Sequence, residues 1–404
     1  MDRLQPKDGK TLSPIGTSFD PSARQIPSAF HKRIAYTVTN ASERLALDLV
    51  RREPGITRAE IGRRIGLTGM SMTRIIDGLE QRGLVRSMGR TGSGRGPKIG
   101  IELEAKAAFS IGLSIKADAL SLILVDFAGE ILAQAHHPSS AKQVTMTIST
   151  ISAHIETFIS NSVPDRAKLF GIGIAITGFF IGSGSQVNPP AQLDELALRD
   201  IDSELSARLN LPVWIDNDGN AAAEAEAMLG VGRWTQNFAY LYFSTGFGGG
   251  IIYNGVLLRG RNGNAGEFAG TIPLEGFFHP NLENLRLLQN SEGSSFETVT
   301  HMLDEFDVNW TSVETWLALS APALNIAVSA ASAVLDPDAI VLGGQLPVTL
   351  AQRMIPLIRF SSAPRRGYIR PVPVVVHAEI TKDPALIGAA ALPLRAHFFG
   401  SAGS

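Results

Sequence analysis

Apolar residues recur at helical spacing in three successive segments of the N-terminal quarter of the chain. Each segment opens with a residue whose side chain can cap a helix, and these residues are Asn40, Thr57 and Thr68. In the third segment Met72, Ile75, Ile76 and Leu79 follow the i, i+3, i+4, i+7 rule, so we expect them to be buried. Two short amphipathic helices joined by a turn at Gly66-Leu67 predict a helix-turn-helix.

The opposite face of the third predicted helix carries polar side chains that suit the reading of base edges in DNA. Ser71, Thr73 and Arg74 lie on this face, and Arg58 begins the preceding helix. We predict that these four residues contact DNA. Three-helix folds also serve as protein docking modules, and that alternative stays open.

Two further segments, residues 84–88 and 98–103, have the composition of short strands that pair antiparallel. Between them residues 89–97 are rich in glycine and hold Arg95, which suits a phosphate or a narrow minor groove. The pattern predicts a winged helix-turn-helix domain over residues 31–104. A solvated linker is the alternative interpretation of the glycine-rich stretch.

Composition places the chain among globular proteins with a basic head. The 404 residues are 44% hydrophobic and 18% charged, which favours two or three domains. Residues 1–100 hold 18 Lys and Arg against 9 Asp and Glu, a net +9, whereas the remainder carries −11. This asymmetry indicates nucleic acid at one end only. Residues 1–30 show no apolar period and predict a disordered arm.

The absence of cysteine excludes disulfides and thiolate metal sites and fits a cytoplasmic location. The first ten residues lack the apolar core of a signal peptide. The most apolar run, residues 169–182, is too short and too rich in glycine for a membrane helix. We therefore expect no membrane role.

From Phe109 onward, strands and helices alternate, which is typical of the α/β class. The strand at residues 171–177 is continuously apolar, and Gly178 ends it at a possible ligand edge. The strand at 212–215 runs into Asp216-Asn217-Asp218 at the start of an Ala- and Glu-rich helix, where ligands commonly bind in such sheets. We interpret the glycines at 245–249 as a loop that approaches a ligand closely, and Asn254-Gly255 as a hairpin turn. The region predicts a pocket for a polyhydroxylated small molecule.

Several motifs of this α/β body occur together in the order and spacing of a known family. They are Gly171–Gly178, Pro212–Asp218, Ser244–Gly250, Ala265–Glu267, Asp336–Gly344 and Gly388–Ala390. Over residues 105–395 the chain resembles the ROK family of bacterial repressors and sugar kinases. The resemblance implies an α/β fold of the actin/hexokinase-like (ribonuclease H-like) type, with two lobes over residues 105–404. It also implies a cleft near residues 217–218 and a C-terminal helix that returns to the first lobe. The leading helix-turn-helix resembles that of the repressor branch.

The resemblance assigns roles to individual residues of this chain. Asn217 and Asp218 match the sugar-binding pair, and the aspartate is the general base in the family's kinases. Glu267 matches a glutamate that accepts hydrogen bonds from sugar hydroxyls, and Glu283 is a looser match to another. Gly178 completes the predicted sugar site. Carboxylates can accept from neighbouring hydroxyls, each bond contributing about 1.5–3 kcal/mol.

Two departures from the family pattern bear on catalysis and metal binding. The kinases open their first strand with Asp and Gly-Gly-Thr, which hold phosphates and Mg²⁺, whereas this chain has Ser114 followed by Lys116-Ala117-Asp118. Phosphoryl transfer depends on such positioning and charge neutralisation, so we expect no kinase activity. Ala269-Gly270 stands where the family often has the Gly-His of a zinc site. We expect neither zinc nor any other cofactor.

These features predict a sugar-responsive transcription regulator, most simply a repressor. Its expected partners are a double-stranded DNA operator, a sugar or sugar-phosphate effector, and further copies of itself in a dimer or tetramer. Two alternatives remain: an ATP-dependent sugar kinase with an added DNA-binding module, and a regulator controlled by a protein partner.

Overall fold

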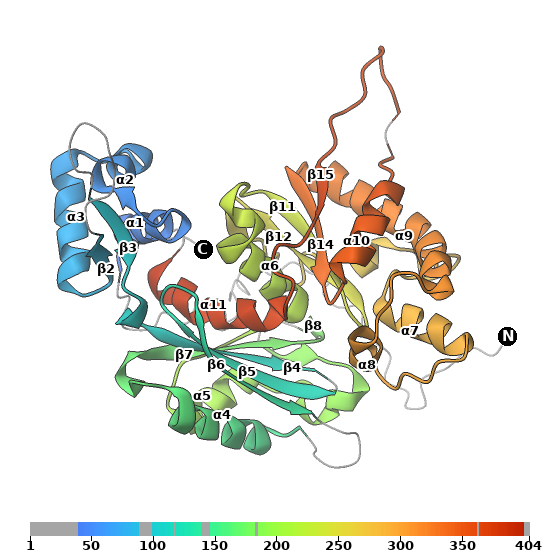
Figure 1. Ribbon diagram of the computed structural model, residues 1–404, viewed down its shortest axis with the longest axis horizontal. Helices are drawn as coiled ribbons and strands as arrows, with labels where there is room; N and C mark the ends of the chain where they lie inside the picture. The colour runs from blue at the N-terminus through green and yellow to red at the C-terminus, as the bar shows by residue number, and fades with distance from the viewer. Residues whose placement is uncertain are drawn as a thin grey trace, which may run out of the picture.

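The computed structural model describes residues 39–88, 99–116, 118–138, 146–181, 185–361 and 363–399. The predicted arm at 1–30 and the predicted wing with Arg95 lie outside these ranges. The N-terminal part forms a winged helix (Figure 1). Its helices are α1 (Ala41–Arg52), α2 (Arg58–Ile65) and α3 (Gly69–Gln81). Its strands are β1 (Ile56–Thr57), β2 (Val85–Ser87) and β3 (Gly100–Leu103), all antiparallel in the order β1-β3-β2.

The three predicted caps are confirmed. Asn40, Thr57 and Thr68 accept a hydrogen bond from the backbone N–H three residues on. Gly66 ends α2 with a φ of 72°, a conformation that glycine adopts without strain. The periodicity predicted the core for three of its four residues, since Met72, Ile76 and Leu79 are buried, whereas Ile75 is half-buried at the edge of the core. The two-residue strand β1 is too short to leave a periodic signal and was not predicted.

The body contains two five-stranded sheets with the same topology. The first has the order β10-β7-β4-β5-β6, with β4, β7 and β10 parallel and β5 and β6 antiparallel. Its strands are β4 (Phe109–Ile115), β5 (Ala119–Asp126), β6 (Ile131–Pro138), β7 (Leu169–Ile176) and β10 (Val213–Asn217). The second has the order β13-β12-β11-β14-β15, again with two parallel pairings (β11–β14 and β14–β15) and two antiparallel pairings (β11–β12 and β12–β13). Its strands are β11 (Phe238–Phe243), β12 (Phe247–Tyr253), β13 (Val256–Leu257), β14 (Ala339–Gly344) and β15 (Val374–His377).

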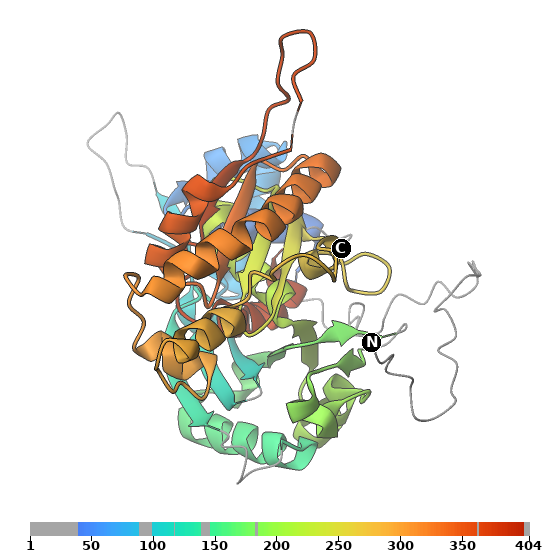
Figure 2. The ribbon, with the colours of Figure 1, turned by 90° about the vertical axis from the view of Figure 1, so that its right-hand side faces the viewer.

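Helices cover both sheets, so the body is built in layers (Figures 1 and 2). On the outer face of the first sheet, α4 (Ile148–Ser162) and α5 (Ile201–Leu209) complete an apolar core. On the outer face of the second, α7 (Leu282–Ser291), α8 (Val299–Asp304), α9 (Thr311–Leu335) and α10 (Val348–Met354) do the same. Between the sheets lie α6 (Asp218–Leu229), packed on β12, and α11 (Pro384–Phe398), packed on β4 and β7. A small hairpin, β8 (Phe179–Phe180) with β9 (Val187–Asn188), extends from the end of β7.

By length and composition α9 alone, among the helices of the described ranges, could cross a membrane. Its Trp316, Leu324 and Val328 are buried in the core of the second lobe. The side chain of Trp316 also donates to the carbonyl of Asn281 (2.9 Å). These contacts assign α9 to the core of the second lobe.

The glycine-rich stretch differs from its predicted form. We expected residues 245–249 to be a loop, but β12 begins at Phe247 and only Ser244–Gly246 form the turn. The glycines allow close packing, because a Cβ on Gly249 would lie 2.0 Å from the carbonyl oxygen of Tyr240. A Cβ on Gly250 would lie 2.7 Å from the Cβ of Ala223 on α6. The predicted hairpin turn at Asn254-Gly255 is confirmed, with φ values of 51° and 73°.

Candidate functional site

Three parallel strands of the first sheet end side by side, and each is followed by a polar residue. Lys116, Thr177 and Asp218 come directly after β4, β7 and β10. Thr177 Oγ1 donates to Asp218 Oδ2 (2.9 Å), which fixes the carboxyl group at this edge. The carboxyl ends of parallel strands are the usual ligand-binding edge of such sheets.

Asn217 is the N-cap of α6, and its side chain makes three hydrogen bonds within the protein. Its Oδ1 accepts from the backbone N–H groups of Gly219 (2.7 Å) and Asn220 (3.2 Å). Its Nδ2 donates to the carbonyl of Gly178 (2.6 Å). Because one of the two Nδ2 hydrogens is used in this way, one N–H hydrogen at most is left for a ligand, and the residue is 8% exposed.

Asp218 and Glu267 form a pair of carboxyl groups that interact through space. Burial raises the pKa of Asp218 to about 6, although hydrogen bonds from Thr177 and Gly219 and the charge of Lys116 oppose this. Burial also raises the pKa of Glu267 to about 7, with a further contribution from the negative charge of Asp218. Both side chains remain partly exposed. Acids whose pKa values are raised by burial and by a specific neighbouring charge are candidates for a functional site.

A third acid and a phenol belong to the same site. Lys116 Nζ lies 3.0 Å from Asp383 Oδ1, just before α11 begins. Tyr242, on β11 of the second lobe, is buried, and its pKa is raised by burial and by the charges of Asp218 and Asp383. The site therefore combines side chains from both lobes. The charge of Lys116 acts on Asp218, and Lys116 is itself paired with Asp383.

The remaining acid of the Asp216-Asn217-Asp218 run has a structural role. Asp216 is fully buried and forms an ion pair with Arg259. Asp216 Oδ1 also accepts from Asn220 Nδ2 (3.0 Å) on α6. Asn264 binds the backbone of Phe180 through both ends of its amide (2.8 and 2.9 Å). These bonds fasten the segment that carries Glu267 to the first lobe.

The other two predicted sugar-site residues differ in their surroundings. Gly178 has a φ of 139°, and a Cβ there would lie 2.6 Å from the carbonyl oxygen of Asn188, so glycine is required for local geometry. Glu283 lies in the first turn of α7 and both of its carboxylate oxygens accept from Arg286. The structure thus brings Asn217, Asp218 and Gly178 into direct contact, while Glu283 is paired within its own helix.

The predicted DNA-binding residues that the structure describes also fall into two groups, those that are exposed and one that is paired within the domain. Ser71, Thr73 and Arg74 are exposed along α3, as the helical period predicted. Arg58 instead lies 2.8 Å from Asp77 Oδ1 and 2.8 Å from Glu80 Oε2, so its charge is balanced by α3. Sequence reasoning missed this pairing, because it joins two helices.

Comparisons with known proteins bear on both halves of the chain. Residues 110–283 match the ROK family, and residues 39–96 match the MarR family. The xylose repressor of Bacillus spizizenii is 30% identical over 57% of this chain, and the match spans 60% of that repressor's own length. The NagC dual regulator of Escherichia coli is 27% identical over 52% of each chain.

Solved structures extend the comparison to the whole fold. A ROK family transcriptional regulator, a homologue of the E. coli MLC protein, covers 90% of this chain and 97% of its own, with a TM-score of 0.65 and 19% identity. A ROK glucokinase from Streptomyces griseus, solved with glucose and AMPPNP, covers 70% of this chain and 99% of its own, with a TM-score of 0.55 and 20% identity. Both likenesses concern the fold. The chain therefore joins a winged helix that matches the MarR family over residues 39–96 to an α/β body that matches the ROK family over residues 110–283 and shares the fold of ROK proteins.

Proposed function

We propose that this protein is a sugar-responsive, DNA-binding transcriptional repressor of the cytoplasm. The winged helix binds an operator in double-stranded DNA, and the ROK domain binds the effector. The observation that carries the proposal is the combination of a solvent-exposed polar face on α3 with the carboxyl pair Asp218 and Glu267 in the same chain.

The effector site takes a ligand that donates hydrogen bonds. Asp218 and Glu267 offer carboxylate oxygens, and Asn217 offers one N–H hydrogen. A sugar presents neighbouring hydroxyls that can satisfy these acceptors together. Because binding also ionises acids whose pKa values burial has raised, a sugar binds more tightly above pH 7 than below pH 6. D-xylose and D-glucose are the first effectors to test, since a xylose repressor and a glucose-bound kinase are among the similar proteins.

The polar groups at the β4–β5 turn argue against phosphoryl transfer. Lys116 is paired with Asp383, and Asp118 Oδ2 accepts from Thr300 Oγ1 of α8 (3.1 Å). A carboxylate here opposes nucleotide phosphates, and the one nearby lysine already has a carboxylate partner. Phosphoryl transfer needs cations placed on the phosphates. We propose that the site binds a sugar without phosphorylating it.

DNA binding follows from the exposure of α3. Ser71, Thr73 and Arg74 reach base edges and phosphates of a major groove, and Arg95 contacts the backbone or the minor groove from the wing. A two-fold dimer of the chain reads two half-sites separated by helical turns. Arg58 supports α3 through its two ion pairs and adds little binding energy of its own.

Two helices connect the two sites. Asp218 starts α6, and Asp383 precedes α11, so both N-termini lie at the carboxyl pair. At their other ends Arg51 of α1 donates to the carbonyl of Met228, and Arg44 Nη2 donates to that of Ala396 (2.7 Å). The winged helix can take two orientations relative to the ROK domain, and the effector shifts the equilibrium between them through these helices. The size of the shift is limited by the difference in the effector's affinity for the two orientations.

Two substitutions separate the proposed roles. Asp218→Asn removes one carboxylate from the sugar site, and we expect its sugar affinity to fall at least tenfold while DNA affinity without effector stays within twofold. Arg74→Ala should weaken operator binding by about 1–3 kcal/mol and leave sugar affinity unchanged. Calorimetry with D-xylose and D-glucose, and fluorescence anisotropy with operator DNA, measure both.

The outcomes distinguish the alternatives. An intact effector response in Asp218→Asn means that the carboxyl pair is not the effector site. Sugar-dependent ATP hydrolysis by the purified chain establishes a kinase instead. A ligand at a hundred times its Kd adds about 2.7 kcal/mol to the free energy of unfolding, so a bound sugar should raise the melting temperature. If a panel of sugars and sugar phosphates leaves the melting temperature unchanged, control by a protein partner replaces control by a sugar.

A further inference from the structure

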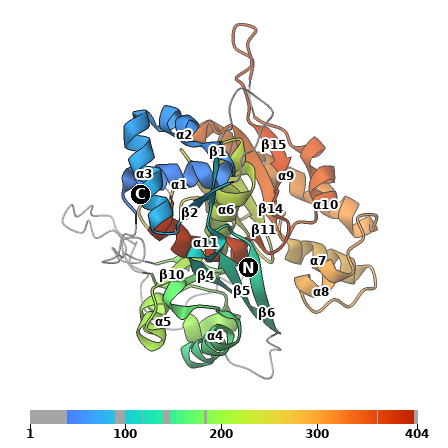
Figure 3. The same cartoon turned by 60° about the vertical axis from the view of Figure 1, so that its left-hand side comes forward.

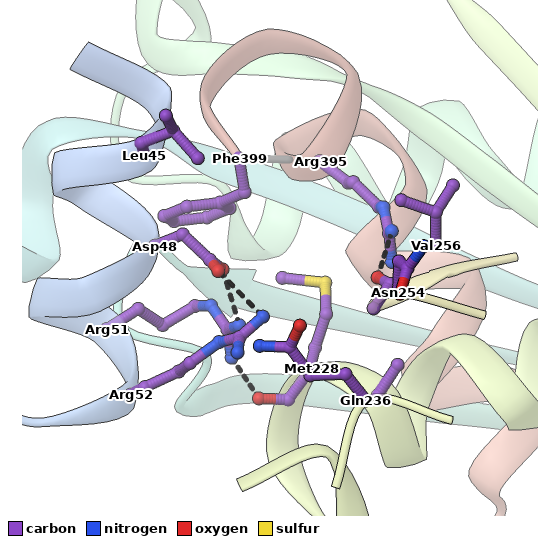
Figure 4. A pocket seen from close by; sticks show the side chains of 12 residues that line it. Leu45, Asp48, Arg51, Arg52, Met228, Gln236, Asn254, Val256, Arg395 and Phe399 are labelled. Atoms are coloured by element: carbon purple, nitrogen blue, oxygen red, sulfur yellow. Dashed lines mark hydrogen bonds and ion pairs between the residues drawn. The ribbon is translucent and has the colours of Figure 1, made fainter. Parts of the chain in front are cut away.

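A cavity lies where the winged helix meets the ROK domain (Figure 4). It is enclosed by α1, by the C-terminal ends of α6 and α11, and by the hairpin between β12 and β13. Figures 1 and 3 both show α1 beside α11 at this junction. Its volume of about 130 Å³ is well above the roughly 15 Å³ that a single water molecule needs.

Basic side chains outnumber acidic ones around this cavity. Arg51, Arg52 and Arg395 carry three positive charges, opposed by Asp48 and Glu224. Asp48 accepts from both Arg51 Nη2 (2.7 Å) and Arg52 Nη2 (2.7 Å). Arg395 is paired with Glu224. One positive charge is therefore left over, and it lies on the Arg51–Arg52 pair.

This pair also has unused donors. The Nε atoms of Arg51 and Arg52 are buried without a hydrogen-bond partner among the residues that the structure describes. The Arg51 side chain is only 7% exposed. In Figure 4 both guanidinium groups and the Gln236 amide converge on the same space. A surplus positive charge that is largely buried is costly, so the arrangement favours an added anion.

We propose that this junction cavity, defined by Arg51, Arg52, Asp48, Gln236 and Arg395, is a second ligand site for a small oxyanion. The ligand class is a phosphate-type group, either free phosphate or the phosphoryl group of a small metabolite. Guanidinium groups match such oxyanions through paired N–H donors. The anion neutralises the surplus positive charge of the Arg51–Arg52 pair.

Binding at this place links α1 to the ROK domain. Arg51 already donates to the carbonyl of Met228 at the end of α6, and an anion held between Arg51 and Arg52 reinforces that contact. The winged helix is thereby held in one setting against the body. The binding step stands by itself, and only its effect on operator affinity rests on the proposed function.

The test is calorimetry of the full chain with sodium phosphate, at pH 7.5 and at constant ionic strength adjusted with sodium chloride. Wild type should bind phosphate saturably with one site per chain. Arg52→Gln should bind it at least tenfold more weakly, and Asp48→Asn severalfold more tightly, because the built-in competing carboxylate is gone. Arg63→Gln, which removes an exposed arginine from α2, should bind like wild type. Opposite effects of two variants at one ion pair are not expected of a purely structural contact.

Further arms identify the source of the phosphate group. Glucose 6-phosphate, titrated into the Asp218→Asn variant, tests whether the cavity admits a metabolite beyond free phosphate. Hydrogen exchange of the α1 amides should slow when phosphate is added to wild type and not when it is added to Arg52→Gln. The proposal is overturned if phosphate binds wild type and Arg52→Gln with equal affinity. It is also overturned if wild type shows no phosphate binding at 10 mM, which corresponds to a binding free energy of roughly −2.7 kcal/mol for a Kd of that value. An Arg52→Gln variant that loses affinity for DNA of arbitrary sequence while phosphate binding is unchanged overturns it as well.

Discussion

The two ends of α6 carry opposite charges, and at each end burial shifts the pKa values of the charged side chains. At the N-terminal end Asp218 lies near Glu267, and burial raises the pKa of both acids. At the C-terminal end Arg51 donates to the carbonyl of Met228, and burial lowers the pKa of that guanidinium. A helix dipole favours acids at its N-terminus and cations at its C-terminus, so each end suits the helix.

The difference teaches what each end can bind. The acidic end holds acceptors that need donors, which hydroxyl groups supply. The basic end holds donors that need an acceptor, which an oxyanion supplies. One helix of 12 residues, about 18 Å long, separates the two. Ligands bound at the two proposed sites would therefore act on the same rigid element.

The largest expected effect comes from loosening α6 from α11. A Cβ on Gly388 of α11 would lie 1.7 Å from the carbonyl oxygen of Ala221 on α6, so Gly388→Ala forces two backbones apart. We expect the substitution to cost about 3 kcal/mol and to weaken the responses at both ends of α6. Urea unfolding of the full chain measures it.

The control for this variant is Gly78→Ala on α3. A Cβ at Gly78 meets no atom within 4 Å, so helix propensity alone should stabilise this variant by about 0.5–1 kcal/mol. Equal effects of the two substitutions would show that the close contact between α6 and α11 is not what holds the two ends together.

The next effect concerns the acidic end and pH. Because the pKa of Glu267 is raised to about 7 in the folded protein, the folded state retains a proton that the unfolded state releases nearer pH 4.5. Stability is therefore lost as pH rises between these values and is lowest above pH 7. Glu267→Gln removes this loss, and we expect it to stabilise the unliganded chain at pH 8 by roughly 1–2 kcal/mol.

Unfolding by urea at pH 5 and at pH 8 tests this expectation. Glu283→Gln is the matched control, because its carboxylate is already paired with Arg286 within one helix. A Glu267→Gln variant whose advantage over wild type is the same at both pH values would contradict the raised pKa.

Much of this architecture could be predicted from local pattern. The caps at Asn40 and Thr68, the buried stripe of α3 and the strand before Asp218 depend on residues close together in the sequence. The family resemblance then indicated the two-lobed fold, because it joined motifs that no local rule connects. Gly249 was misinterpreted as part of a loop, since the sequence does not show that Tyr240 presses against it.

The chemistry of the site depended on contacts that are distant in sequence. Lys116 is paired with Asp383, 267 positions away, and no spacing rule signals such a pair. The arginines at the junction were equally hidden. Arg51 and Arg52 look like the basic last turn of an amphipathic helix, and only the fold places Met228 and Arg395 against them.

The smallest expected effect tests whether the two ends of α6 are independent in the absence of ligands. Asp218→Asn and Arg52→Gln change residues near opposite ends of the helix and share no bonding partner. Substitutions at such separations add to within about 0.5 kcal/mol, so the double variant should equal the sum of the single changes in unfolding free energy. A larger deviation would mean that the two ends of α6 are energetically coupled even without ligands. The coupling between the effector site and the winged helix would then be a property of the unliganded protein. Additivity, by contrast, leaves the coupling to the ligands themselves, so the same double-variant cycle repeated with D-xylose and phosphate present is where a coupling energy of about 1–3 kcal/mol should emerge.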